Sequence, residues 1–577
     1  MKVKTLKLPK RTGTYADALA ITGLGRLLSL LGARGGRIED KGGIYELTFR
    51  RPVDLYSLDY EWVHDDPGYR YIKLKKDSNA PPNSIDYKAE RERLLKYRKL
   101  RNSLRRATKG RLSEEQRAQL KQAEPMPRWY LYQNVNVLQG FGPYNKLHEA
   151  IRASAPEEFA ATLRAKLAAL ATGKDVSEVK GAFAPKLSVV QVFTPSVGKG
   201  VNMPKTVMGL AKTLSTGEFL DWFEEYLKYL GLELVTNARA IGSDIKLFVM
   251  TSKSLEVGAL GGLSDEFFKL NLPWSSAQID VQGSLGLAQI LVGHLAQEES
   301  EERYRTPRDV VSGLQTAYFK SLGNARALAN TSFIRLPGWF PVTEENANEW
   351  LEILEEHRRV LALLDEEKSE EAGLLFLYRD FLSAGDAKTL LEFLASYAPH
   401  VVKARERKRF VWQFTTRNLR RLLLSFGDKF KDIVDDPGFR AVAAAIRRAT
   451  VIEQYHKAKD NQVFEIEYGL FQDLKRKARF PEQFISALSD FVARYNYENA
   501  RREEQLKGKG GRRRPRLTTS DLDHVVELVD TKGSEPVAML LIAYGSARDP
   551  RTSEDVEPAV VQEEVGQQGQ VEENVSG

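Results

Sequence analysis

Nearly every segment from Glu344 to Tyr544 repeats apolar residues at spacings of three and four, which is the period of an amphipathic α-helix. A helix with one apolar face must bury that face against another element, and the economical packing of many such helices is a bundle. We therefore expect an all-α C-terminal helical bundle, with helices over Glu344–Asp365, Glu370–Ser383, Ala387–Ala404, Thr416–Leu424, Phe439–Lys459, Glu465–Lys477, Glu482–Gln505, Asp521–Asp530 and Glu535–Tyr544.

The part of the chain that precedes this bundle mixes two periodicities. Helical spacing predicts helices over Tyr15–Leu31 (ended by Gly32), a charged pair over Lys88–Gln122 broken near Gly110, Lys146–Leu170 and Glu218–Leu230. Alternating apolar residues predict strands over Tyr45–Arg50, Tyr69–Leu74, Trp129–Leu138 and Leu187–Thr194, and a strand pair over Glu233–Thr251 with a turn at Gly242–Asp244. The expected fold class is α+β: a mixed N-terminal region followed by an all-α bundle.

A chain of 577 residues is too long for a single hydrophobic core and should divide into domains. Pro337 and Gly338 interrupt the chain just before the helical part, so we expect a mixed α+β domain over 1–340 and the bundle over 341–550. Residues 551–577 contain seven acids, one base and few large apolar residues, and we expect this acidic tail to be disordered.

The basic residues are clustered. The chain has 86 Lys and Arg against 78 Asp and Glu, yet the stretch from Lys88 to Lys121 holds 13 basic and 4 acidic residues. Two further clusters cover Lys403–Arg421 and Arg501–Arg516. Such clusters are the usual footprint of nucleic-acid binding, and the alternative is solvated helix faces with internal ion pairs, because Glu residues are interleaved. The candidate phosphate-binding residues are Arg105, Arg106, Arg417, Arg420, Arg512, Arg513 and Arg514.

Three glycine-containing loops are candidates for closer contact with nucleic acid. Around Gly323, in YFKSLGNARALANTSFIRLPGWFP (Tyr318–Pro341), a flexible backbone carries basic and amide side chains without competing acids. The loops at Leu138–Leu147 and Pro195–Lys205 have the same character. Asn and Lys on such loops can touch phosphates or base edges, although each loop could equally be a plain turn. The candidate residues are Lys199, Asn202, Lys205, Asn145, Lys146, Lys320, Asn324 and Arg326.

The residues needed for common catalytic sites are missing. The chain has no cysteine, which excludes thiolate nucleophiles and cysteine-ligated zinc, and its seven histidines are too scattered to predict a metal site. PSVGKGVNM at Pro195–Met203 lacks the spacing of a phosphate-binding P-loop. We expect neither catalysis, nor a cofactor, nor a metal. One rival hypothesis is a metal-dependent phosphohydrolase that uses His64 and Asp65; the alternative is that the aspartates before Pro67 cap a turn.

The sequence also bears on location. No run approaches the roughly 18 consecutive apolar residues of a membrane span, and the N-terminal MKVKTLKLPKRTG lacks the apolar stretch of a signal peptide. We expect a cytoplasmic protein without membrane contact.

The chain resembles the large subunit of type I CRISPR surveillance complexes (Cascade), most nearly those of subtypes A and B. The resemblance lies in the Tyr318–Pro341 stretch, in FVWQFTTRNLRRLL at Phe410–Leu423, in SDFVARYNYENARR at Ser489–Arg502 and in VAMLLIAYGSARDP at Val537–Pro550. The layout of a mixed region ahead of a helical bundle also agrees, up to about Pro550. Zinc-binding cysteines found in some relatives are absent here.

This resemblance implies a protein without hydrolytic activity that binds CRISPR guide RNA and other Cascade subunits. The N-terminal part of such proteins probes double-stranded DNA for the motif beside the target and helps to separate the strands. Their C-terminal bundle resembles the small subunit and guides the displaced strand, and a helicase–nuclease is recruited in trans. A second rival hypothesis is a standalone RNA-binding scaffold without CRISPR partners.

Overall fold

The structure is a computed structural model that describes residues 1–74, 80–108, 112–188, 190–195, 221–270, 272–273, 275–297, 305–323, 325–505 and 512–550. The chain is α+β, as expected, and forms two compact units. The first contains Met1–Trp274 and Arg308–Leu336; the second contains Ser275–Pro307 and continues from Pro337. The expected boundary at residue 340 falls close to the Leu336–Pro337 junction. The acidic tail lies outside the described residues.

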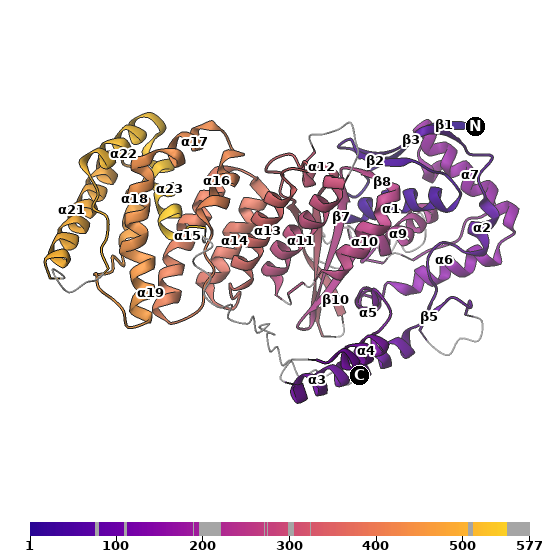
Figure 1. Ribbon diagram of the computed structural model, residues 1–577. Helices are drawn as coiled ribbons and strands as arrows, with labels where there is room; N and C mark the ends of the chain where they lie inside the picture. The colour runs from indigo at the N-terminus through magenta and orange to yellow at the C-terminus, as the bar shows by residue number, and fades with distance from the viewer. Residues whose placement is uncertain are drawn as a thin grey trace. The chain divides into compact units, whose positions relative to one another are not determined.

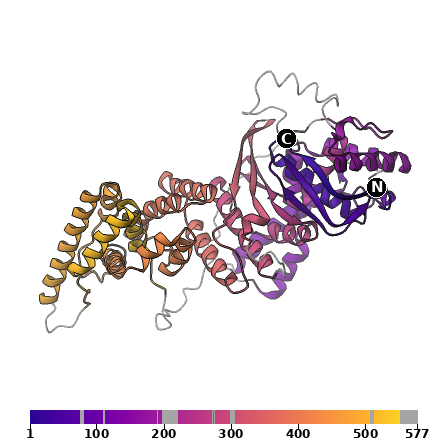
Figure 2. The same cartoon turned by 90° about the horizontal axis from the view of Figure 1, so that it is seen from above.

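Two antiparallel sheets organise the first unit (Figures 1 and 2). One has the order β1 (Lys2–Pro9), β3 (Ile44–Asp54), β2 (Gly36–Asp40) and β8 (Ser254–Glu256). The other has the order β10 (Ala325–Arg335), β9 (Val311–Leu322), β7 (Asp244–Ser252) and β6 (Thr236–Ile241). The expected strand pair with its turn at Gly242–Asp244 is confirmed as β6 and β7, and the expected strand at Tyr45–Arg50 lies within β3.

The helices of the first unit complete its core. They are α1 (Tyr15–Leu30), α2 (Tyr60–Asp65), α3 (Tyr87–Thr108), α4 (Glu114–Ala123), α5 (Trp129–Val137), α6 (Phe141–Ala153), α7 (Pro156–Thr172), α9 (Trp222–Val235) and α10 (Leu260–Lys269), and α12 (Pro307–Val310) leads into β9. Short 3₁₀ turns cover Val176–Glu178 and Val257–Ala259, and β4 (Ile72–Lys73) pairs in parallel with β5 (Ile85–Asp86).

Helices α1 and α9 cross at two glycines. A Cβ atom on Gly23 would lie 1.7 Å from the carbonyl oxygen of Leu227, and one on Gly231 would lie 2.1 Å from that of Leu19. Because no side chain separates the two backbones, the helices approach closely and bury most of their residues. This contact fixes α9, whose first residue follows Asp221.

Several expected elements of the first unit are wrong. Trp129–Leu138 was expected to be a strand but forms α5, since its buried residues Trp129, Tyr132 and Val135 recur every three positions. Leu187–Thr194 contains no strand among its described residues, and Tyr69–Leu74 contributes only the two residues of β4. The glycine-bearing segment after Leu138 begins α6 rather than forming a loop, and the single helix expected over Lys146–Leu170 is broken before Pro156.

The second unit is the expected helical bundle, in which no strand occurs among the described residues (Figure 1). A π-helical turn at Arg448–Ile452 joins two of its helices. The helices are α11 (Ser276–Gln297), α13 (Ala347–Ala362), α14 (Ser369–Ala384), α15 (Ala387–Glu406), α16 (Thr416–Leu424), α17 (Asp428–Asp435), α18 (Pro437–Arg447), α19 (Glu453–Ala458), α20 (Leu470–Lys477), α21 (Pro481–Gln505), α22 (Thr519–Lys532) and α23 (Ser534–Ser546).

The position of helix α11 contradicts the expected domain boundary at residue 340. The helix precedes this residue in the sequence but belongs to the second unit. The Glu366 carboxylate accepts hydrogen bonds from the backbone nitrogens of the first three residues of α11, at 2.7–3.2 Å. The amide Nε2 of Gln278 in turn donates to carbonyl oxygens at the end of α13, including that of Ala362 at 2.9 Å. Glu366, which follows α13, therefore caps the start of α11, and Gln278 of α11 caps the end of α13. Local periodicity cannot reveal this long-range pairing.

A buried histidine should make the second unit sensitive to acid. His357 on α13 is 1% exposed, its Nδ1 lies 2.7 Å from the Tyr378 hydroxyl, and burial lowers its pKa to about 3. The unfolded chain takes up this proton near pH 6.5 while the folded chain does not, so the free energy of unfolding falls as the pH drops below 6.5. We expect a loss of about 2 kcal/mol between pH 6.5 and 5 from this group.

Chemical denaturation of the second unit at several pH values measures this loss. The pH dependence should be shallower in His357→Gln, whatever the stability of that variant at pH 7. His524, whose pKa is raised by its hydrogen bond with Asp436, serves as control, and His524→Gln should keep the acid-induced loss. An unchanged pH dependence in His357→Gln would contradict the assignment.

Candidate nucleic-acid interface

Helix α3 presents a row of cations to solvent. Lys88, Arg91, Lys96, Lys99 and Arg106 are all exposed, and at 100° per residue they lie on one half of the helix. None of them forms an ion pair with any residue that the structure describes. One acid, Glu92, is exposed on the same half of the helix. We call the five basic residues the α3 basic face. It extends about 27 Å along the helix, from Lys88 to Arg106.

Few contacts hold α3 to the rest of the unit, and they use its other side. Leu94 is its one fully buried residue among those described. The Glu90 carboxylate accepts a hydrogen bond from the backbone nitrogen of Met126 at 2.9 Å, and Arg93 donates to the carbonyl oxygen of Gln122 at 3.1 Å. Helix α4 buries no residue at all. The confirmed α3–α4 pair therefore leaves its cations exposed to solvent. Arg106 belongs to this face, whereas the side chain of Arg105 lies outside the described residues.

The second basic cluster is used for internal packing. Arg417 and Arg421 donate to the Glu352 carboxylate at 2.8 and 2.7 Å, which ties α16 to α13. Arg420 binds Asp435 through two hydrogen bonds of 2.8 and 2.7 Å, and these bonds lower the pKa of Asp435. As candidates for phosphate binding, Arg417 and Arg420 are therefore corrected: their guanidinium groups already have carboxylate partners.

Two candidate arginines of the third basic cluster, Arg501–Arg516, also form ion pairs within the chain. Arg512 and Arg514 both pair with Glu453, whose side chain is 0% exposed. Arg514 is itself buried, donates to the carbonyl oxygen of Arg448 at 2.8 Å and lies 3.7 Å from the ring centre of Phe464. As candidates for phosphate binding, Arg512 and Arg514 are therefore corrected, because both guanidinium groups pair with Glu453. Arg513 remains exposed and makes no ion pair with a described residue.

The candidate residues of the three glycine-containing loops also divide into buried and exposed side chains. Asn145 is buried on α6, where its amide donates to the carbonyl oxygen of Ile72 at 2.7 Å and accepts from the nitrogen of Ile72 at 3.1 Å. It anchors β4 and cannot reach a base edge, so it is removed from the candidates. Lys146 points to solvent from the same helix. Lys199, Asn202 and Lys205 lie outside the described residues.

The stretch around Gly323 is the tip of the β9–β10 hairpin. Gly323 has φ +73°, Lys320 is exposed without an ion pair among the described residues, and Asn324 lies outside them. Arg326 donates to the carbonyl oxygen of Ser243 at 2.5 Å. Asp244 accepts from the backbone nitrogen of Ser321 at 2.8 Å, so the tips of the two hairpins are held together. Of this group, Lys320 remains free to contact a ligand.

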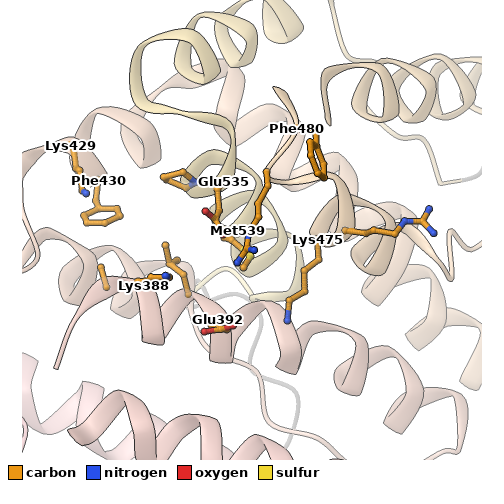
Figure 3. A pocket seen from close by; sticks show the side chains of 13 residues that line it. Lys388, Glu392, Lys429, Phe430, Lys475, Phe480, Glu535 and Met539 are labelled. Atoms are coloured by element: carbon orange, nitrogen blue, oxygen red, sulfur yellow. Dashed lines mark hydrogen bonds and ion pairs between the residues drawn. The ribbon is translucent and has the colours of Figure 1, made fainter. Parts of the chain in front are cut away.

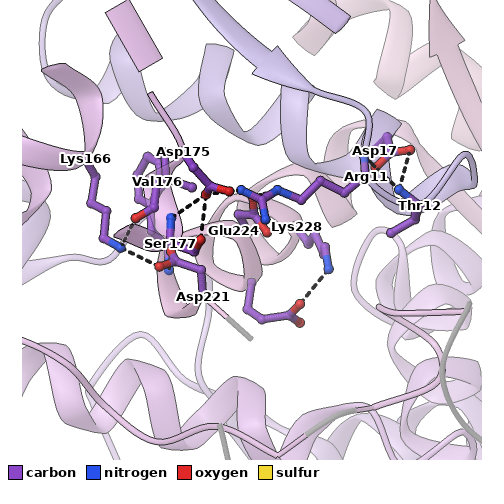
Figure 4. A network of polar contacts seen from close by, with 12 residues as sticks. Arg11, Thr12, Asp17, Lys166, Asp175, Val176, Ser177, Asp221, Glu224 and Lys228 are labelled. Carbon is purple, nitrogen blue, oxygen red and sulfur yellow. Dashed lines mark hydrogen bonds and ion pairs between the residues drawn. The ribbon is translucent and has the colours of Figure 1, made fainter. Parts of the chain in front are cut away.

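A network of ion pairs lies at the start of α9 (Figure 4). The segment before α9, 196–220, carries three of the candidates and lies outside the described residues. Lys166 donates to Asp221 and to the carbonyl oxygen of Val176. Lys228 pairs with Glu225 at 2.5 Å, and both contact Thr194. Thr194 and Asp221, the described residues that flank the segment, are therefore held by buried charged partners. The sequence gave little indication of this ion-pair network, beyond the three-residue spacing of Glu225 and Lys228 on α9.

Arg11 joins the same network between two acids. It pairs with Asp175 and, through Nε at 2.7 Å, with Glu224. Burial raises the pKa of Glu224 to about 7, against the opposing effect of Arg11. The charge at the start of α9 therefore changes near neutral pH.

His64 and Asp65 lie close together in the structure, with 3.5 Å between the His64 Nδ1 and a carboxylate oxygen of Asp65. The Nε2 of His64 lies 2.9 Å from the carbonyl oxygen of Ser154, and its ring packs against Phe159. Asp66 accepts from the nitrogen of Gly68 at 3.0 Å, the turn-capping role considered for these aspartates. Within the described residues, no group of three or more His, Asp or Glu side chains is placed to hold a metal ion.

Comparison with models of known protein families gave no match for this chain, and no curated protein matched it either. Among the described residues, no helix combines the length and the apolar character that crossing a membrane requires. The function must therefore be inferred from the chain's own residues.

Arg514 and its neighbour Arg513 give a direct test of which cations are structural. Arg514→Ala should destabilise the second unit by about 3–5 kcal/mol, because it leaves the buried Glu453 carboxylate without its buried partner. Arg513→Ala should change the free energy of unfolding by less than about 0.5 kcal/mol. Denaturant unfolding of both variants measures the difference, and equal stability of the two would refute the structural role of Arg514.

Proposed function

We propose that the chain binds nucleic acid through the α3 basic face, as the non-catalytic large subunit of a type I CRISPR RNA-guided surveillance complex. The observation that carries the proposal is the contrast between α3 and the other basic clusters. Arg417, Arg420 and Arg514 are paired with acids, whereas the cations of the α3 basic face have no such partners among the described residues. Exposed, unpaired cations in a row are suited to a row of phosphates.

The dimensions of the face agree with this role. Successive phosphates of one DNA strand advance by about 3.4 Å along the helix axis, so about 27 Å covers roughly eight base pairs. Lysine and arginine on an exposed helix attract any sequence alike, because phosphate contacts carry no base information. The α3 basic face therefore supplies attraction and steering rather than recognition.

Recognition of a specific motif requires shorter polar groups that are held in place. The resemblance implies that the N-terminal region recognises the motif adjacent to the target in double-stranded DNA and promotes strand separation. Lys199, Asn202 and Lys205 stay candidates for this role. The described residues on either side of their segment, Thr194 and Asp221, are bonded to the buried charged side chains of Glu225 and Lys166. Lys320 and Lys146 are further candidates, since both are exposed.

The resemblance supplies the partners of the proposed assembly. They are CRISPR guide RNA, the displaced DNA strand, the other Cascade subunits and a helicase–nuclease recruited in trans. The proposal assigns this chain no hydrolytic activity, so cutting would be performed by the recruited enzyme.

Substitution of the α3 basic face tests the binding claim. The triple variant Lys88→Gln, Arg91→Gln, Lys99→Gln should bind duplex DNA and RNA more weakly than the parent, for every sequence. The slope of log affinity against log salt should become shallower by up to about three units, one for each lost phosphate contact. Stability should change little, because all three side chains are exposed.

The matched control removes the same charge elsewhere. In Arg417→Gln, Arg420→Gln, Arg421→Gln the net charge falls equally, but these residues already pair with acids. This control should keep the salt dependence of the parent while losing some stability. Equal changes in salt slope for the two triple variants would show that binding follows net charge rather than the α3 basic face.

Purification of the tagged chain from its source cells tests the proposed assembly. We expect several partner proteins and a uniform RNA of about one CRISPR repeat plus one spacer to co-purify with it. Heterogeneous RNA without partner proteins would instead support a standalone RNA-binding scaffold. Metal-dependent nuclease activity that follows the chain through further purification, and is lost in His64→Ala, would support the phosphohydrolase hypothesis.

A further inference from the structure

A pocket of about 540 Å³ lies in the second unit among α15, α17, α20 and α23 (Figure 3). This volume falls within the range of about 300–1,000 Å³ that is typical of small-ligand sites. Part of its wall is apolar, formed by Leu391, Phe430, Pro536 and Met539. Phe480, which follows α20, lines the pocket with a side chain that is 55% exposed. Phe430 is only 3% exposed, so the pocket offers a ligand one accessible aromatic ring, Phe480, and the thioether of Met539.

Cations surround this apolar wall, and they divide into two kinds. The two arginines that line the pocket, Arg476 and Arg479, pair with Asp473 at 2.7 Å and with Glu535 at 3.2 Å. The three lysines, in contrast, form no ion pair with any residue that the structure describes. They are Lys388, Lys429 and Lys475.

Lys475 is half-buried and lacks an acidic hydrogen-bond partner among the described residues. Its ammonium group donates to the hydroxyl of Ser396 at 2.8 Å, and burial lowers its pKa despite the nearby charge of Glu392. A half-buried ammonium with a neutral hydrogen-bond partner is stabilised by an anion that enters the pocket. Glu392 also lines the pocket, but the basic side chains of the lining outnumber its acids, so the pocket favours an anionic ligand.

We propose that this pocket binds one nucleotide of a single-stranded nucleic acid, with the base against the apolar wall and the phosphate at the lysines. The inference rests on the proposed nucleic-acid-binding function and deepens it, because it adds a site in the second unit that does not involve α3. Stacking on an aromatic ring accepts any base, so the site would hold a strand without reading its sequence.

The type of free cation distinguishes a phosphate from an acidic peptide. Arginine binds carboxylates through two parallel hydrogen bonds, and both arginines of the pocket are already occupied by acids of this chain. Lysine acts as a compact point charge, which is suited to a phosphate. The volume exceeds what a phosphate alone would need and leaves room for a base and sugar beside it.

A natural reporter lies in the pocket wall. The chain has six methionines; among the described ones, Met539 alone lines the pocket, whereas Met250 is buried in β7 of the first unit. With ¹³C-methyl-labelled methionine in the full chain, adenosine 5′-monophosphate should shift the Met539 methyl resonance in a saturable way. The Met250 resonance should not move, and inorganic phosphate at the same concentration should cause a smaller shift.

Exposed side chains allow matched variants that keep the fold. Phe480→Ala should weaken nucleotide binding about fivefold or more, the effect of losing one stacked aromatic ring. Phe410→Ala, which removes a 70% exposed ring outside the pocket, should not change it. Lys429→Ala should weaken binding of a short single-stranded oligonucleotide and reduce its salt slope by about one unit. Lys431→Ala, an exposed lysine on the same helix but outside the pocket, is the control.

Three results would overturn the assignment. The first is a Met539 resonance that adenosine 5′-monophosphate leaves unchanged. The second is an equal effect of phosphate and nucleotide, which would make the pocket a plain anion site. The third is a shift caused by a synthetic peptide of residues 551–577 but not by the nucleotide, which would assign the pocket to an acidic peptide. Because none of these measurements involves α3, their failure would leave the α3 basic face to be judged by its own variants.

Discussion

Many cations of this chain pair with its own buried or half-buried carboxylates. This pairing determines which basic side chains remain available to bind an external anion. Glu453 is completely buried, and its charge is tolerated there because Arg512 and Arg514 neutralise it. Similar ion pairs hold α16 against α13 through Glu352 and fix the start of α9 through Lys166 and Asp221. An arginine that already binds a carboxylate in this way is a structural residue. Residues outside such pairs are the ones that remain free to attract an external anion.

Applied to the whole chain, this distinction separates two surfaces with different chemistry. The α3 basic face is an exposed row of cations with little apolar surface, which is suited to the phosphates of a duplex or a structured RNA. The pocket bounded by α15 and α23 combines lysines with aromatic and aliphatic side chains, which is suited to an unstacked nucleotide. One surface belongs to the first unit and the other to the second, so a polymer that spans base-paired and single-stranded regions would have a suitable partner surface in each unit.

Local sequence patterns predicted most helices of the second unit from their apolar faces, but they missed α11 and α17. The strand pair β6–β7 was predicted from alternating apolar residues and the turn at Gly242, and the helix pair α3–α4 from helical spacing with a break near Gly110. Helix α5 was not, since its aromatic and β-branched residues favour a strand locally and tertiary packing overrides that preference. Asn145 looked like a loop residue beside two glycines, yet α6 starts within that segment and buries it. Clustering of charge in the sequence identified α3 as a candidate phosphate-binding helix. The structure was needed to exclude Arg420 and Arg514 as phosphate-binding residues, because their acidic partners lie 15 and 61 positions away in the sequence.

Chemical footprinting of lysines measures the central claim directly. The full chain is acetylated briefly with and without a DNA or RNA ligand, and the modification of each lysine is compared by mass spectrometry. The account predicts that Lys88, Lys96 and Lys99 are strongly protected by the ligand, and that protection weakens as salt increases. Lys431, which is exposed on α17 outside both proposed sites, should react equally in both states. Unchanged modification of the three α3 lysines under conditions where the nucleic acid is bound would contradict the account.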